Sequence, residues 1–105
     1  NYVDELSVWH LKILYYFVNP TERLKEKSIN ISKYYMGSPI DPLLEYYVEL
    51  SGRDEFIRII VKDLYARSLF NTESLNGTMT ANGMVASRLS EFGKKFMQYI
   101  GEAEI

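Results

Sequence analysis

The most apolar stretch of the chain lies between residues 6 and 18, and it limits the folds that the chain can adopt. Its apolar side chains recur at a spacing of three to four residues, which predicts a helix. The stripe consists of Leu6, Trp9, Ile13 and Phe17. Further apolar side chains flank it, so that little more than Ser7 and Lys12 remains for a polar face. We therefore expect the rest of the chain to bury this helix on most sides.

The length of the chain, 105 residues, favours one hydrophobic core, and we expect a single domain over residues 1–105. The hydrophobic fraction of 47% and the charged fraction of 25% are those of an ordinary globular protein rather than of a disordered tail. The sequence begins with Asn1 rather than Met, which fits a domain cut from a longer protein or a processed product.

Composition excludes several classes of site. The chain has no cysteine and one histidine, which excludes disulfides, thiolate chemistry and a clustered transition-metal site, so His10 is expected to be a packed or rim histidine. The sequence contains no recognisable nucleophile elbow, phosphate loop or Ser-His-Asp arrangement, and we expect neither catalysis nor a cofactor. Lys12 interrupts the best apolar run and nothing near Asn1 resembles a signal peptide, so we expect a cytoplasmic protein without a membrane span.

Caps and helix breakers predict the segments that follow. Asn19-Pro20 either ends the first helix or starts a further turn through Leu24, and residues 22–27 are expected to form a solvated connection. Residues 28–37 fit a short strand or a short helix equally well. Asp41 followed by Pro42 is typical of an N-cap with proline at the first helical position, so a helix is predicted from there to about residue 50.

The strongest helical pattern spans residues 53 to about 67. The run from Ser51 to Asp54 resembles a capping box at its start. The buried face of this helix is expected to hold Phe56, Ile57, Ile60, Val61 and Leu64. The opposite face then carries Glu55, Arg58, Lys62 and Tyr65 together, which makes it the first candidate for binding a partner.

Two strands are predicted after this helix, at residues 69–72 and 84–89. They would form a hairpin whose turn is either Asn76-Gly77 or Asn82-Gly83. Ser90 then caps a last helix. One face of that helix is expected to hold Phe92, Phe96, Tyr99 and Ile100. The predicted fold class is therefore mainly α with a small β-hairpin (α+β).

The order of three helices, a hairpin and a closing helix resembles the winged helix-turn-helix family. Asp63-Leu64-Tyr65-Ala66-Arg67-Ser68-Leu69-Phe70 is similar to the end of a recognition helix that runs into the first wing strand. Leu89-Ser90-Glu91-Phe92-Gly93 is similar to the Leu-Thr-x-x-Gly pattern that begins the helix after the wing. The sequence departs from the family at Ser68, where glycine is usual, and in its acidic second helix. The order of segments also resembles the C-terminal part of uncharacterised bacterial proteins linked to prophages or to abortive phage infection.

The family resemblance implies that the helix at 53–67 enters the major groove of double-stranded DNA. The nucleic-acid-binding residues would be Arg58, Lys62 and Tyr65, with Arg88 near the wing. The net charge of −2 and the nine tyrosines favour the alternative, a winged helix that binds a protein or forms a homodimer. Both hypotheses describe a non-catalytic binding module, either of a DNA-binding regulator or of a phage-defence or other bacterial protein.

Overall fold

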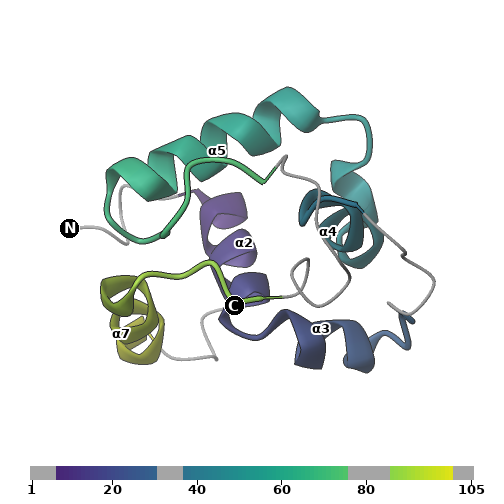
Figure 1. The fold of residues 1–105 in the computed structure, drawn as a ribbon, viewed down its shortest axis with the longest axis horizontal. Coiled ribbons are helices and arrows are strands. Elements are labelled where there is room, and N and C mark those ends of the chain that lie inside the picture. The colour runs from purple at the N-terminus through teal and green to yellow at the C-terminus, as the bar shows by residue number, and fades with distance from the viewer. Residues whose placement is uncertain (1–6, 31–36, 76–85, 101–105) are drawn as a thin grey trace.

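The structure is a computed structural model that describes residues 7–30, 37–75 and 86–100. Within these ranges the chain forms five α-helices and one 3-10 helix (Figure 1). They are α2 (Val8–Val18), α3 (Pro20–Glu26), α4 (Ile40–Tyr46), η2 (Val48–Leu50), α5 (Asp54–Ala66) and α7 (Glu91–Ile100). The prediction of a mainly helical fold is confirmed for this part of the chain, which contains no strand beyond isolated bridges.

The central helix is α2, as its nearly unbroken apolar surface predicted. It contacts α3, α5 and α7, and Figure 1 shows it between α5 and α7. Four of its side chains are fully buried, and they are Ile13, Leu14, Tyr16 and Phe17. The helix begins at Val8, and Ser7 is its N-cap.

A second helix follows α2 directly, so the alternative of a further turn through Leu24 is confirmed. The prediction of a connection at residues 22–27 was wrong, because α3 extends to Glu26. The Asn19 side chain accepts a hydrogen bond from the Glu22 backbone N–H at 3.3 Å, and Pro20 occupies the first turn of α3. A capping side chain followed by proline is a strong helix start. Leu24 anchors α3 in the core with 2% of its surface exposed.

The helix predicted between Asp41 and residue 50 is divided in two. Its cap was also predicted wrongly, because Pro39 is the N-cap residue and Asp41 lies inside α4, accepting a hydrogen bond from the Ser38 backbone N–H at 3.0 Å. Tyr47 leaves the helical conformation with φ −110° and ψ 84°. There its ring packs edge-on against Trp9, and its hydroxyl donates to the Lys12 carbonyl at 3.0 Å. Packing against α2 thus overrides continuation of the helix. Residues 31–36, in the segment predicted as a short strand or helix, lie outside the described residues.

The helix predicted at 53–67 is α5, and its buried side is the predicted one. Ile57, Ile60, Val61 and Leu64 are buried, and Phe56 packs at the edge of the core. The capping box predicted at its start does not form. Arg53 is the N-cap residue and makes no side-chain cap, while the Ser51 backbone N–H donates to the Val48 carbonyl at the end of η2.

The two segments predicted as strands meet at one antiparallel bridge, between Phe70 and Leu89. The Asn71 backbone N–H donates to the Arg88 carbonyl at 2.8 Å, and the Ser90 N–H donates to the Leu69 carbonyl at 3.1 Å. Both Asn-Gly pairs lie outside the described residues. The β-hairpin therefore stays a prediction.

The last helix, α7, is capped by Ser90 and buries Phe96 as predicted, but two other residues expected on its inward face are exposed. Its buried residues are Gly93, Phe96 and Met97. Phe92 and Tyr99, which were expected to point inward, are 46% and 85% exposed. The cause is the close approach of Gly93 to the Leu69 backbone, because a Cβ placed on Gly93 would lie 2.2 Å from the Leu69 oxygen. The side chain of Ile100 lies outside the described residues.

Candidate binding surface

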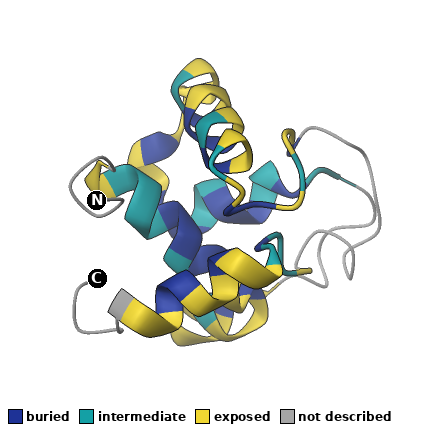
Figure 2. Ribbon diagram, turned by 90° about the vertical axis from the view of Figure 1, so that its left-hand side faces the viewer, coloured by how far each residue is buried: buried dark blue, intermediate teal, exposed yellow. Residues whose placement is uncertain are grey.

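Three of the four predicted binding residues lie together on the outward side of α5. Arg58, Lys62 and Tyr65 are exposed, with 54% of the Arg58 side chain and 47% of Tyr65 accessible. Figure 2 shows α5 at the top of the molecule, with both exposed and buried residues along its ribbon. Spacings of three and four residues place side chains on one helix face, so this part of the prediction reflects the helical repeat.

The same side of α5 holds an aliphatic residue that sequence analysis missed. Ile59 is 61% exposed, although the three other aliphatic residues between Ile57 and Val61 are buried. A rotation of about 100° per residue separates it from Ile60 and puts it beside Lys62, which is the signal that could have found it. We call Glu55, Arg58, Ile59, Lys62 and Tyr65 the α5 outer face.

Charges on the α5 outer face are partly compensated. Arg58 Nη2 lies 3.5 Å from Glu55 Oε1, and the two side chains are 54% and 81% exposed. An ion pair so exposed contributes little to stability, and either partner can exchange it for another. The face therefore offers two basic side chains, one acidic side chain, a phenol and an apolar contact to whatever it binds.

A short turn sets the direction in which α5 leaves the preceding helices. Between η2 and α5 the chain passes through Ser51, Gly52 and Arg53, and Gly52 has φ +80°, in the left-handed region that favours glycine. The Arg53 guanidinium lies over the Phe56 ring at 4.2 Å from its centre. The turn therefore joins η2 to α5 through three residues.

Arg88, the fourth predicted residue, lies on a different segment. It belongs to the bridge that follows α5, where its carbonyl accepts from Asn71. Arg88 is half-buried, and this burial lowers the pKa of its guanidinium from the usual value. An arginine remains charged at neutral pH even so. The structure thus groups three of the predicted residues on α5 and holds the fourth by its backbone beside Asn71.

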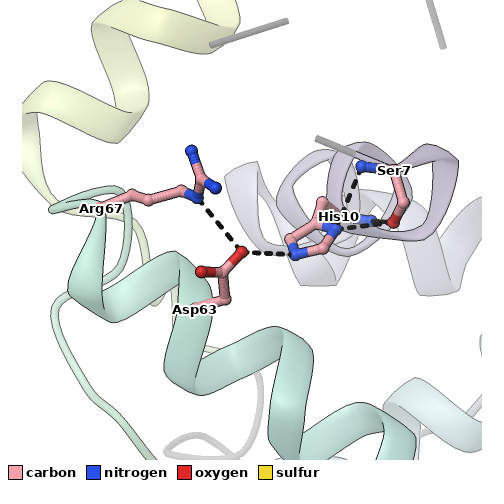
Figure 3. A network of polar contacts seen from close by, with 4 residues as sticks. All are labelled: Ser7, His10, Asp63 and Arg67. Carbon is pink, nitrogen blue, oxygen red and sulfur yellow. Dashed lines mark hydrogen bonds and ion pairs between the residues drawn. The ribbon is translucent and has the colours of Figure 1, made fainter. Parts of the chain in front are cut away.

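The polar network of Figure 3 joins the start of α2 to the end of α5. His10 Nε2 lies 2.9 Å from Asp63 Oδ2, and the same oxygen accepts from Arg67 Nε at 3.1 Å. On the other side of the imidazole, Ser7 Oγ lies 2.6 Å from Nδ1. His10 is a rim histidine, with 14% of its side chain exposed, as expected from the sequence.

This network orders Ser7, His10 and Asp63 as a nucleophilic triad does, with a hydroxyl beside one imidazole nitrogen and a carboxylate beside the other. The Ser7 backbone N–H also donates to Nδ1 at 3.2 Å, so Nδ1 is an acceptor and Nε2 carries the proton that is donated to Asp63. Sequence analysis did not bring these three residues together. Asp63 lies 53 residues from His10, and no local pattern connects them.

The described residues hold no group of three or more His, Asp or Glu side chains placed to bind a metal ion. Nor does any helix in the described ranges have the length and apolar character needed to cross a membrane. Comparisons with models of known protein families, with curated proteins and with solved structures gave no match.

Proposed function

We propose that this chain is a non-catalytic binding module, a winged helix-turn-helix domain that contacts double-stranded DNA through the α5 outer face. The observation that carries the proposal is the placement of Arg58, Lys62 and Tyr65 on the outward side of a helix that follows a glycine turn. Helices presented in this way enter the major groove, where arginine and lysine donate to base edges and phosphates.

The bridge after α5 supports the same proposal. A wing would begin where Phe70 and Leu89 pair, directly beyond the C-terminal end of α5. Arg88 is held at this position by the backbone hydrogen bond from Asn71. A basic residue there would add a phosphate contact beside the groove that α5 occupies.

The test is binding to a mixed pool of double-stranded DNA across a salt series. Each phosphate contact contributes about 0.9 to the slope of log affinity against log salt concentration. The double variant Arg58→Ala with Lys62→Ala is expected to lower that slope by about two. A matched control removes two exposed lysines elsewhere, Lys25→Ala with Lys95→Ala, and is expected to leave the slope nearly unchanged.

Two outcomes would refute DNA binding through α5. The first is a native chain that shows no affinity for the pool even at low salt. The second is an equal loss of slope in both double variants, because that would mean that only the net charge matters and not the α5 outer face.

We assign the Ser7, His10 and Asp63 network to helix capping and docking rather than to catalysis. Ser7 Oγ accepts from the His10 backbone N–H at 3.2 Å, which forms a capping box at the start of α2. Asp63 is shared with Arg67, which ties down the end of α5 as well. Treatment with a serine-directed fluorophosphonate is expected to leave Ser7 unmodified, and selective labelling that disappears in Ser7→Ala would overturn this assignment.

A second candidate function is association with a protein partner or a second copy of the chain through the same face. The specific observation in its favour is Ile59, which places an apolar side chain, 61% exposed, among the charges of the α5 outer face. Sedimentation over a concentration series separates this candidate from the first. Self-association that Ile59→Asp abolishes, together with no DNA binding, would favour it.

A further inference from the structure

A hollow of about 240 Å³ lies where α5, the start of α4 and residues 73–75 meet. Its floor is apolar, with Ile57, Val61 and Leu75 each at most 3% exposed. Its rim is polar and open to solvent. The rim residues are Asp54, Arg58, Glu73 and Ser74. An apolar floor with a few polar groups at the opening is the usual construction of a small-molecule site.

The rim has an excess of negative charge. Arg58 is already paired with Glu55, which does not line the hollow. Asp54 and Glu73, in contrast, form no ion pair with any other described residue. The rim thus carries two carboxylates against one guanidinium, which leaves an excess of one negative charge at the opening of the hollow.

We propose that the hollow binds a small organic cation, with its ammonium or guanidinium group between Asp54 and Glu73 and its apolar body on Ile57, Val61 and Leu75. The carboxylates attract the charge, while burial of the apolar body removes hydrocarbon surface from water. A simple inorganic cation would gain only the electrostatic attraction, because it has no hydrocarbon surface to bury. The proposal is independent of DNA binding, although Arg58 belongs to both surfaces.

Three probes of the same length separate charge from hydrophobicity, and they are hexylamine, 1-hexanol and hexanoate. Each is titrated into the isotopically labelled 105-residue chain, and the backbone amide signals are followed by NMR. Hexylamine is expected to shift the amides of Asp54, Arg58 and Ser74 in a saturable way. Hexanol is expected to bind more weakly than hexylamine by up to about fivefold for each carboxylate that the ammonium contacts, since an exposed ion pair is worth up to about 1 kcal/mol. Hexanoate is expected to bind more weakly than hexanol.

Charge removal at the rim gives the second arm of the experiment. Asp54→Asn and Glu73→Gln keep the shape of exposed side chains, so the fold should persist, which circular dichroism checks. Each is expected to weaken hexylamine binding by up to about fivefold, while leaving hexanol binding unchanged. Glu49→Gln is the matched control, because Glu49 is exposed and does not line the hollow.

Three results would overturn the proposal. One is equal binding of hexylamine and hexanol, and another is a response confined to amides away from the hollow. The third is an equal effect of Glu49→Gln and Glu73→Gln, which would reduce the attraction to the overall charge of the protein. None of these results depends on whether the chain binds DNA, so the two proposals fail separately.

Discussion

Replacement of Gly93 by alanine tests how α7 is seated on the rest of the protein. A Cβ at this position would lie 2.2 Å from the Leu69 carbonyl oxygen and 3.1 Å from its carbon, and both are backbone atoms that no side-chain rotation can move away. The displacement needed falls on the segment where Ser90 N–H donates to that oxygen at 3.1 Å. Overpacking of this kind costs about 1–3 kcal/mol, and loss of the hydrogen bond costs about 1 kcal/mol more.

Helix propensity acts in the opposite direction to this overlap. Alanine is a better helix former than glycine by about 1 kcal/mol, so helix propensity alone would stabilise the variant. We expect the overlap to exceed this gain, with a net loss of about 2 kcal/mol in the free energy of unfolding. Urea denaturation followed by circular dichroism measures the loss, which at a slope of about 1–2 kcal/mol per molar urea lowers the midpoint by roughly 1 M or more.

Lys94→Ala is the control, because Lys94 is the next residue of α7 and is exposed. Its substitution is expected to change stability by no more than about 0.5 kcal/mol. A Gly93→Ala midpoint at or above that of the native chain would refute the reasoning. In that case α7 would not approach the Leu69 backbone, and the rotation that exposes Tyr99 would have no cause.

Three further predictions concern the end of α5, its polar network and the aromatic core. Ser68 has φ +66°, so Ser68→Gly is expected to stabilise the protein by about 0.5–1 kcal/mol in urea denaturation; Ser68→Ala, which keeps the Cβ, should give no such gain. Asp63→Ala removes the acceptor of His10 and Arg67 and is expected to cost about 1–2 kcal/mol; a loss no larger than that of Glu55→Ala on the exposed side of α5 would contradict a docking role for the network. Burial raises the pKa of the Tyr47 phenol, with the neighbouring Tyr46 and Tyr15 adding to the shift. The stability that the neutral phenol provides is therefore present below about pH 10 and is lost as pH rises further, because the unfolded phenol ionises first. In urea denaturation, Tyr47→Phe should be less stable than the native chain at neutral pH and should lose less stability between pH 9 and 11. Parallel plots of unfolding free energy against pH for the two proteins would contradict this.

Helical periodicity explains which parts of the fold were predictable. In α2 and α5 the apolar side chains repeat at the helical spacing over about three turns, so that both the helix and its buried side follow from local sequence. The division of α4 from η2 does not, because it depends on Tyr47 reaching Trp9 and the Lys12 carbonyl on another helix. The apolar periodicity of the sequence does not indicate that the Tyr47 ring is stabilised more by a distant contact than by continuation of its own helix.

The same distinction separates the parts of the candidate site. Arg58, Lys62 and Tyr65 share a face because they share a helix, and sequence was enough to group them. The link between His10 and Asp63 and the hollow beneath Asp54 and Glu73 are assembled from segments far apart in the chain. A site assembled from distant segments can be predicted only after the packing of the helices is known.

The junction between α5 and α7 shows why a short sequence pattern can carry non-local information. Ser90 Oγ accepts from the Gly93 N–H at 2.9 Å, which caps α7, and the same hydroxyl donates to the Ser68 carbonyl. Gly93 lies one turn later, where only a residue without a Cβ can pass the Leu69 backbone. A serine three residues before a glycine therefore starts the helix and sets its rotation at once. Since Ser68 and Leu69 close the end of α5, these few residues tie the helix that bears the candidate binding face to the last helix of the chain.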